Sequence, residues 1–473
     1  MTVMRNPSAD VRVAWFSPFP PVRTGIAADS AGLVAALGGR GWRIDPYPET
    51  AAHDFPWTHR QRPYDLVVYQ FGNSSHHDYI WPYALRYPGL VVLHDTRLHH
   101  ARAALLLREK RRDEYRRELA RNEPALDPDA AELAVAGFDS RLYYEWPMVR
   151  GLVERSRLVA VHGDATRREL VEALSIPNST TPNSTTPNST TPNSQSAYAE
   201  RIVSIRLGHG QFVGAAQAAA ARATIRGRYG IPEDAIVFGV FGGLTPEKRI
   251  AQVVAAFRAT QVYAPHVHLL LGGAAAEHFR IEDYRSVAGV TITGYIEDTE
   301  LTDHIASVDV SLNLRWPTAR ETSGPWLRAL AAGVPTVVID LLQLGDLPTL
   351  DPRTWQLTTP DIGYRVSDSG RRDAVAIAID IMDEDHSLQL AMRRLAADAD
   401  LRARLGRAGQ QHWQREHTIE AMTDDYVSAI ARCASDGELA AVGGNRAGIP
   451  DHFASGDETL RALLAPFGIE TPW

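Results

Sequence analysis

Residues 308–340 carry the pattern that most constrains the fold of this chain: an apolar run, a polar loop, an amphipathic segment and a second apolar run. The runs 308–314 and 336–340 are predicted to be buried strands. Pro325 suits the first position of a helix between them, and Gly333 with Pro335 ends that helix. A strand, a helix and a strand in this order form a unit with two parallel strands, so the pattern predicts an α/β fold.

The polar loop 315–324 of this unit is the first candidate binding site. In a parallel sheet such a loop lies at the carboxyl edge of the strands, where ligands bind, and the N–H groups that begin the next helix attract anions. The groups of interest in this loop are one carboxylate, two of its hydroxyls, a glycine and two arginines: Glu321, Thr322, Ser323, Gly324, Arg315 and Arg320. These groups suit a ligand with both hydroxyl and phosphate groups. The alternative is a surface loop that only caps its helix.

The length and composition of the chain bound its class. A chain of 473 residues is too long for a single core, so two large domains are predicted. The net charge of −8 argues against bulk binding of nucleic acid. Cys433 is the only cysteine, which excludes an intrachain disulfide and a cysteine-based metal cluster. The start of the chain does not resemble a signal peptide, and no apolar run nears the ~18 residues of a membrane span, so a cytoplasmic protein is predicted.

Polar side chains in the first half of the chain follow predicted strands. These strands are expected at residues 11–16, 42–47, 65–70, 90–93, 158–161 and 201–206. Asn73 and His77 come soon after the third strand, and His94 with Asp95 directly follows the fourth, which favours a polar substrate pocket at one sheet edge. Surface or helix-capping histidines are the alternative. A metal site is disfavoured because the spacing fits no standard zinc pattern.

Gly25 is a candidate for close approach of a ligand to the backbone. It lies after the first strand, where a helix over about residues 27–37 begins, and the N-terminus of a helix favours an anion. A single glycine is not a phosphate-binding fingerprint, so a turn without a ligand explains it equally well.

Residues 102–122 are predicted to form one charged helix. Eight Lys or Arg residues and four Asp or Glu residues lie between positions 102 and 121, together with leucines at 105–107. A solvated charged face is the simpler interpretation. The alternative is docking to anionic lipid headgroups, which would place the protein peripherally at the inner face of a membrane.

The segment 177–194 repeats the sequence PNSTT and is predicted to be a disordered or mobile loop. It has no apolar residue to bury, and a proline at every fifth position excludes a helix. After a further strand, the chain is expected to leave the first domain at about residue 207.

The second half repeats the α/β pattern and contains a candidate diphosphate site. A strand over 236–241 is followed by Gly242, Gly243 and Lys248, and then by a helix with apolar residues at 250, 253, 254 and 257. Two glycines and a lysine at a helix start after a strand suit a diphosphate, because amides and an ammonium both bind its oxygens. A solvated lysine is the alternative. Gly294, Tyr295 and Ile296 leave the later strand 290–293, where a base could rest against the backbone.

Six motifs in this order and spacing resemble family 4 glycosyltransferases of the GT-B architecture. They are PPVRTGIAADS, YQFGNSSHH, PGLVVLHDTRLHH, FGGLTPEKR, TGYIEDTEL and LRWPTARETSGPWLRALAAGVPTVV. The resemblance implies two Rossmann-like domains whose parallel sheets face one another across a cleft. The expected domains are an acceptor-side domain over 1–207, a nucleotide-sugar domain over 208–417, and C-terminal helices over 418–473 that pack back toward the first domain.

The resemblance also implies a reaction and roles for single residues. The reaction is transfer of a sugar from a nucleotide-diphosphate donor to a sugar, glycan or lipid-linked acceptor, with retention of anomeric configuration and without a metal or other cofactor. Lys248 would bind the donor diphosphate, Gly25 would lie near it, and Ser323 with Gly324 would add polar contacts. Glu321 would contact hydroxyls of the donor sugar, and His94 would lie beside that sugar. Gly294 to Ile296 would frame the base, and Asn73, His77 and Asp95 would lie on the acceptor side.

Two positions depart from the family pattern. Many relatives carry an arginine where this chain has Gly243. Arg328 occupies the place of the second glutamate of the family's Glu-x7-Glu region, which commonly holds the ribose, and one residue is missing between the two positions. Arg315 or Arg328 would then supply a cation to the phosphates. The competing functions are a sugar-nucleotide epimerase or hydrolase of the same architecture and a non-catalytic nucleotide-sugar-binding protein.

Overall fold

The computed structural model describes residues 11–137, 143–175, 194–277, 279–341, 344–358, 373–435 and 465–468. These residues fall into two compact units. The N-terminal unit draws on Met1–Arg206, Ala319–Thr322 and Met422–Trp473, and the C-terminal unit comprises Leu207–Thr318 and Ser323–Ala421. The predicted second domain, 208–417, includes the four residues 319–322, which the structure groups with the N-terminal unit. The PNSTT repeat lies outside the described residues.

A six-stranded parallel sheet forms the N-terminal unit, in the order β2-β1-β3-β4-β5-β6. Its strands are β1 (Arg12–Phe16), β2 (Arg43–Tyr47), β3 (Leu66–Phe71), β4 (Leu90–Leu93), β5 (Leu158–His162) and β6 (Ile202–Ile205). All six residues of β3 are buried, as expected for a central parallel strand that is covered on both faces. The helices between them are α1 (Gly25–Gly39), α2 (Phe55–Gln61), α3 (Trp81–Arg86), α7 (Arg150–Arg155), α8 (Asp164–Ser175) and α9 (Ser194–Arg201).

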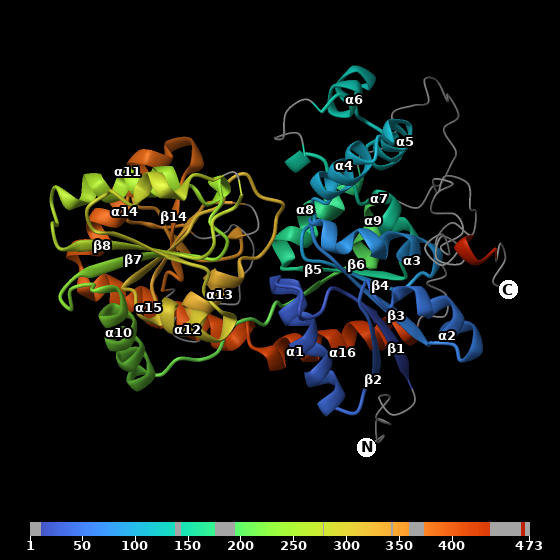
Figure 1. The fold of residues 1–473 in the computed structure, drawn as a ribbon, viewed down its shortest axis with the longest axis horizontal. Coiled ribbons are helices and arrows are strands. Elements are labelled where there is room, and N and C mark those ends of the chain that lie inside the picture. The colour runs from blue at the N-terminus through green and yellow to red at the C-terminus, as the bar shows by residue number, and fades with distance from the viewer. Residues whose placement is uncertain are drawn as a thin grey trace. The chain divides into compact units, whose positions relative to one another are not determined.

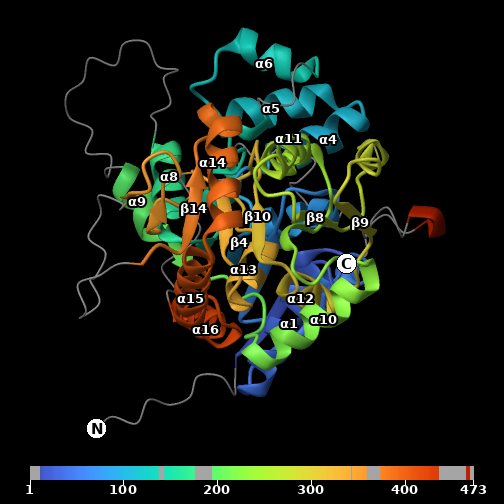
Figure 2. The same cartoon turned by 90° about the vertical axis from the view of Figure 1, so that its left-hand side faces the viewer.

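Three further helices leave the sheet between β4 and β5 and form a small core of their own. They are α4 (His99–Arg108), α5 (Arg112–Asn122) and α6 (Pro128–Val135), and Figures 1 and 2 both show them stacked on one another. Leu106, Tyr115 and Leu119 are fully buried in this cluster. The prediction of one helix over 102–122 is wrong: Lys110 adopts a φ of 60°, in the left-handed region, and the chain turns there.

An eight-stranded sheet forms the C-terminal unit, in the order β13-β12-β14-β11-β10-β7-β8-β9. Its strands are β7 (Ile236–Phe241), β8 (Val267–Gly272), β9 (Val290–Gly294), β10 (Val310–Asn313), β11 (Thr336–Ile339), β12 (Thr349–Leu350), β13 (Leu357–Thr358) and β14 (Ala376–Ile379). Only the short edge strand β13 is antiparallel to its neighbour within the described part of this sheet. The predicted α/β fold with two parallel-sheet domains is therefore confirmed.

Helices cover both faces of the C-terminal sheet (Figure 1). α11 (Ile250–Gln261) and α14 (Glu384–Ala397) pack on one face, and α10 (Ala215–Tyr229), α12 (Asp298–Ala306) and α13 (Gly324–Ala331) on the other. The predicted apolar side of α11, residues 250, 253, 254 and 257, is buried in the core. α13 begins at Gly324, so Pro325 stands at its second position rather than its first.

The last long helices join both units. α15 (Ala399–Glu416) packs on α13 in the C-terminal unit, whereas α16 (Ile419–Ser435) enters the N-terminal unit from Met422 onward. There Tyr426 stacks on Trp15 with ring centroids 5.6 Å apart, and Asp425 pairs with Arg206 at 2.6 Å. No helix among the residues that the structure describes has the length and apolar character needed to cross a bilayer.

We predict that the buried pair Arg102–Glu118 holds the helical cluster α4–α6 together. The Arg102 side chain is 1% exposed, donates to Glu118 through two bonds of 2.6 and 3.0 Å, and lies 4.7 Å from the centroid of the Trp81 ring. Glu118→Ala removes the carboxylate that accepts both of these bonds from a buried cation, so the free energy of unfolding should fall by about 3–5 kcal/mol in a urea titration.

The matched control is Glu132→Ala in α6. Its partner Arg116 is 41% exposed, so loss of that ion pair should change the urea midpoint very little. Equal losses of stability in Glu118→Ala and Glu132→Ala would show that the buried pair stabilises the protein no more than the exposed pair does.

Candidate functional site

Glycines occupy the carboxyl ends of three neighbouring strands of the C-terminal sheet. Gly242 follows β7, Gly272 ends β8 and is followed by Gly273, and Gly294 ends β9. A Cβ atom on Gly273 would lie 2.0 Å from the carbonyl oxygen of Gly242, and the Gly242 N–H donates to the Gly272 carbonyl at 2.9 Å. We call these four residues the glycine edge. Because it carries no side chains, a ligand there would meet the backbone directly.

Lys248 and the start of α13 flank the same glycine. Lys248 lies in the short helical turn Pro246–Lys248, and its Nζ donates to the carbonyl of Phe241. A Cβ atom on Gly242 would lie 3.1 Å from the Lys248 Nζ and 3.3 Å from Cγ of Pro325 in the first turn of α13. The ammonium and the positive end of the helix dipole therefore share one location, which suits an anion.

Arg249 fastens the loop that carries Lys248. Its backbone adopts a left-handed φ of 58°, and its guanidinium donates to the buried carboxylate of Glu384 at the start of α14 at 2.8 Å. These hydrogen bonds raise the pKa of Arg249 above its ordinary value. On the other side of the loop, the Trp316 N–H donates to the Glu247 carbonyl at 2.8 Å. Lys248 is thus held from both sides.

A second polar group begins at the N-terminus of α13. The Ser323 hydroxyl caps the helix by accepting from the Trp326 N–H. Gly324 packs against the His209 ring, because a Cβ atom on this glycine would lie 3.1 Å from His209 Nε2. Arg328 donates through Nε to His209 Nε2 at 2.9 Å and through Nη2 to Asp298 Oδ1 at 2.5 Å. Arg328, predicted to face phosphate, therefore has a carboxylate partner within its own unit.

Five further residues that were predicted to bind the donor lie in the C-terminal unit: Gly243, Gly294, Tyr295, Ile296 and Arg315. Gly294 adopts a φ of 72°, and the Tyr295 side chain is 49% exposed. Ile296 Cδ1 lies 3.0 Å from the position of a Cβ on Gly272. Arg315 is exposed, and the backbone at Gly243 is exposed with open space beside it.

Hydrogen bonds of His94 and Gln70 organise the carboxyl edge of the N-terminal sheet. His94 follows β4, Gln70 lies in β3, and His162 ends β5. His94 Nε2 bonds to Gln70 Oε1 at 2.7 Å, and His94 Nδ1 to His162 Nε2 at 3.2 Å. Tyr426 of α16 donates to the same Gln70 oxygen at 3.2 Å. Burial, then the neighbouring His162 and His77 rings, lower the pKa of His94 well below its ordinary value.

The predicted acceptor-side residues are tied to this edge by backbone contacts. His77 is buried, and its Nδ1 bonds to the Gln70 carbonyl at 2.9 Å. The Asp95 carboxylate accepts from the Asn73 N–H at 2.7 Å, and the Asn73 side chain accepts from the Ala101 N–H in the first turn of α4 at 2.9 Å. Asp95, Asn73 and His77 therefore fix the loop after β3 and the start of α4.

The predicted loop 315–324 divides between the two units. In the N-terminal unit, the Ala319 carbonyl accepts from the Thr96 and Arg97 N–H groups at 3.1 and 3.2 Å, and Arg320 donates to Glu169 at 3.0 Å. Glu321 and Thr322 are half-buried in that unit, while Ser323 and Gly324 begin α13 in the other. Gly25 is the exposed first residue of α1, and a Cβ on it would meet nothing within 4 Å.

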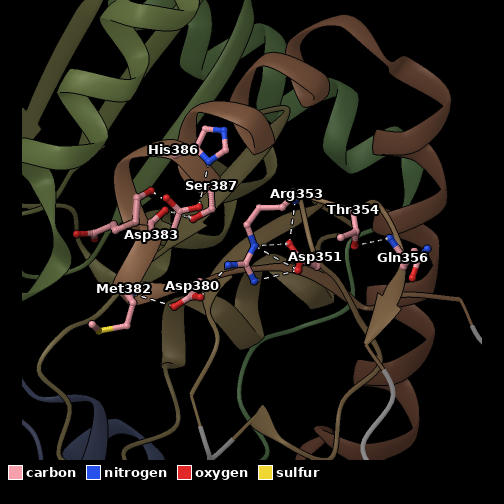
Figure 3. Close-up of polar contacts among 10 residues, drawn as sticks. Asp351, Arg353, Thr354, Gln356, Asp380, Met382, Asp383, His386 and Ser387 are labelled. Atoms are coloured by element: carbon pink, nitrogen blue, oxygen red, sulfur yellow. Dashed lines mark hydrogen bonds and ion pairs between the residues drawn. The ribbon is translucent and has the colours of Figure 1, made fainter.

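A further polar cluster lies where β14 ends (Figure 3). Arg353 bridges Asp351 at 3.0 Å and Asp380 at 2.8 Å, and Asp380 Oδ1 also accepts from the Met382 N–H. Burial, and then the neighbouring carboxylates of Asp380 and Asp351, raise the pKa of Asp340, which follows β11. Within the described ranges, no group of three or more His, Cys, Asp or Glu side chains is arranged to hold a metal ion.

Sequence reasoning did not single out four of these residues. Asp298 and His209 are joined through Arg328, and no short spacing in the sequence connects the three. Gln70 lies inside a strand, and the motif YQFGNSSHH that contains it did not mark it as a site residue. His162 could have been singled out from the sequence, because it stands at the end of the predicted strand 158–161, just as His94 follows the predicted strand 90–93.

Solved structures with the same fold are glycosyltransferases. The catalytic domain of starch synthase IV of Arabidopsis thaliana, bound to ADP and acarbose, matches at a TM-score of 0.57 and 11% identity over 90% of this chain and 99% of its own. Sucrose-phosphate synthase of Thermosynechococcus elongatus matches at 0.54 and 16% identity, over 89% and 98%. HepE of Anabaena, in complex with UDP, matches at 0.53 and 13% identity, over 89% and 100%. No protein-family model and no curated protein matches the sequence. The chain therefore has the two-sheet GT-B fold that these enzymes share.

Gly242→Ala should destabilise the protein. The φ of 94° at this position disfavours an L side chain, and the added methyl group would press on Lys248 and Pro325, so the free energy of unfolding should fall by about 1–3 kcal/mol in urea. Gly243→Ala is the matched control, because a Cβ there meets nothing within 4 Å. The control should stay within about 0.5 kcal/mol of wild type. An unchanged midpoint for Gly242→Ala would contradict the close packing.

His77 should make stability depend on pH. Burial lowers the pKa of His77 from 6.5 to about 4, so the unfolded state binds this proton more tightly than the folded state. The free energy of unfolding should therefore fall as the pH drops from 6.5 to 4, by about 3 kcal/mol in total from this group. His77→Gln should remove that part of the slope in urea titrations at pH 7 and pH 4.5. A slope that stays unchanged in His77→Gln would contradict the assignment.

Proposed function

We propose that this chain is a glycosyltransferase that moves a sugar from a nucleotide-diphosphate donor to an acceptor hydroxyl, with retention at the anomeric carbon and without a metal. The observation that carries the proposal is the placement of Lys248 and the first turn of α13 on either side of Gly242, at the carboxyl edge of one sheet of a GT-B fold. The UDP and ADP in the Anabaena and Arabidopsis structures support a nucleoside diphosphate as the leaving group.

The chemistry proposed for this site is stabilisation of the leaving diphosphate. As the bond between C1 of the sugar and the phosphate oxygen breaks, negative charge collects on the diphosphate beside the Lys248 ammonium and the positive end of α13. Both groups are already in place, since Arg249 and Trp316 hold the loop. A contact of this kind contributes about 10²–10³ in rate.

The acceptor completes the exchange of bonds. Its hydroxyl oxygen forms the new bond to C1 on the face that the leaving group vacates, and its proton passes to an oxygen of the departing diphosphate. The products are the glycosylated acceptor and the nucleoside diphosphate. Because the leaving group takes the proton, this scheme needs no pair of enzyme carboxylates of the kind that hydrolases use.

The N-terminal unit is proposed to supply the acceptor side through Asn73, His77 and Asp95. Both nitrogens of His94 bond to Gln70 and His162. The predicted contact of His94 with the transferred sugar therefore requires one of these bonds to be exchanged. Without that exchange, the ring of His94 fixes the relative positions of the ends of β3, β4 and β5. Glu321 keeps its predicted role toward hydroxyls of the donor sugar.

Lys248→Ala should reduce sugar transfer by a factor of about 10²–10³ while leaving the fold intact, because one preformed charge beside the leaving group is lost. Candidate donors are identified first, by the rise in melting temperature that UDP, GDP, ADP and dTDP sugars produce in the wild-type protein. Transfer from the stabilising donor is then followed with a labelled sugar and a set of hydroxyl acceptors.

Lys110→Ala is the matched control, since Lys110 and Lys248 are the two lysines of the chain and Lys110 is exposed. It should transfer sugar at the wild-type rate. Near wild-type transfer by Lys248→Ala would reject the proposed role. Release of free sugar or an epimer from the donor alone would favour the hydrolase or epimerase instead.

A further inference from the structure

We propose that Asp298 accepts hydrogen bonds from the ribose hydroxyls of the bound nucleotide, with Arg328 and His209 as positioning residues. The inference rests on the proposed function, because it requires a nucleoside diphosphate beside Lys248. The observation behind it is a buried arginine whose donors converge on an exposed carboxylate beside the glycine edge.

The contacts of Arg328 hold the Asp298 carboxylate in one place. The Arg328 side chain is 9% exposed, whereas that of Asp298 is 67% exposed. Arg328 Nη2 donates to Asp298 Oδ1 at 2.5 Å and Nη1 to the Asp298 carbonyl at 3.3 Å, so the guanidinium grips both the side chain and the backbone of this residue. Its Nε donates to His209 at 2.9 Å, which fixes the plane of the guanidinium.

His209 is itself held by the segment around it. Its N–H donates to the His417 carbonyl at 3.1 Å, and its own carbonyl accepts from the Trp413 side chain at 2.8 Å. Because a guanidinium only donates, His209 Nε2 must accept from Arg328, and the ring proton is on Nδ1. The ion pair of Arg328 with Asp298 is therefore held in place through His209, unlike a loose ion pair at the surface.

The position of Asp298 connects it with the diphosphate site. Asp298 is the first residue of α12 and lies beyond Gly294 and Ile296, whose side chain reaches over Gly272. On the other side, His209 packs on Gly324, the residue before Pro325, and Pro325 and Lys248 both adjoin Gly242. Lys248 and Asp298 are thus connected by two series of contacts. One passes through the start of α13, and the other follows the glycine edge.

Lys248 at one end of these contacts is positive and Asp298 at the other end is negative, so each end favours a different part of the ligand. Lys248 attracts phosphate oxygens, whereas the ionised Asp298 repels them and can only accept hydrogen bonds. A neutral group with hydroxyl donors must therefore lie against Asp298. In a nucleoside diphosphate the group next to the phosphates that carries such donors is the ribose. The exposed ring of Tyr295, three residues before Asp298, provides an adjacent surface for the base.

The test compares a ribonucleoside diphosphate with its 2′-deoxy form by titration calorimetry on the full chain. The pair is UDP with dUDP, ADP with dADP or GDP with dGDP, whichever ribonucleotide binds the wild-type protein most tightly. Wild type should prefer the ribonucleotide by roughly 10-fold or more, as expected for hydrogen bonds to a charged acceptor. Asp298→Ala should reduce this preference to less than about 2-fold and weaken the 2′-deoxy form little.

Variants of the supporting residues separate positioning from folding. Arg328→Gln should lower the ribose preference in the same direction, and Arg328→Lys should restore part of it, since a lysine still pairs with Asp298 but cannot grip it at two points. Glu300→Gln is the control on the same helix, because Glu300 is exposed and pairs with Arg228 instead. It should keep the full preference. Melting temperatures confirm that each variant is folded.

Three results would overturn the inference. An unchanged ribose preference in Asp298→Ala would show that the Arg328–Asp298 pair is only structural. A changed ratio between UDP-sugar and UDP, with the ribose preference intact, would place Asp298 against the transferred sugar. Failure of wild type to bind any nucleoside diphosphate would remove the proposed function and this inference together.

Discussion

The contact between Lys248 and the backbone around Gly242 is the interaction on which the proposed chemistry depends. An ammonium can approach a carbonyl and a helix start this closely only where the strand end carries no side chain, and Gly242 with its φ of 94° meets that condition. The ion pair of Arg249 with Glu384 then fixes the loop, so the charge does not have to be gathered when a ligand arrives. A strand end without a side chain and an anchored loop together turn one lysine into a preorganised charge.

The alternation of apolar runs and helical segments was sufficient to predict the fold. A buried strand such as β4 or β7 reads as a short continuous apolar run, and its bounds follow because turn residues enclose it. The strands β12, β13 and β14, which lie beyond residue 340, were not predicted. A second exception was the helix predicted over 102–122. Its composition is helical throughout, and only the left-handed backbone at Lys110 divides it. Lysine rarely adopts the left-handed conformation, so residue preferences do not predict a break in the helix at this position. The packing of α4 on α5 imposes the conformation instead.

The candidate site was predictable where one motif supplies the whole arrangement, as in the glycine–lysine loop after β7. It was not predictable where the partners are remote in sequence. Arg328 stands where the resemblance led us to expect a glutamate, and its meaning depends on Asp298, thirty positions earlier on another helix. The same holds for Gln70, whose role at the N-terminal edge comes from His94 and from Tyr426 far along the chain. The spacing of residues along the sequence predicts local geometry, but it does not predict which distant side chains the fold brings together.

The use of lysine and arginine in this chain distinguishes a cation that is proposed to bind ligand from the cations that hold the fold together. The sequence has 49 Lys and Arg residues, and lysine occurs only at positions 110 and 248. The buried cations that organise the fold, such as Arg102 and Arg328, are arginines, whose planar guanidinium satisfies several acceptors in fixed directions. A cation that must serve a phosphate oxygen as a compact point charge is better supplied by an ammonium. The presence of lysine at 248, in a chain with one other lysine, therefore fits a ligand-binding role better than a structural one.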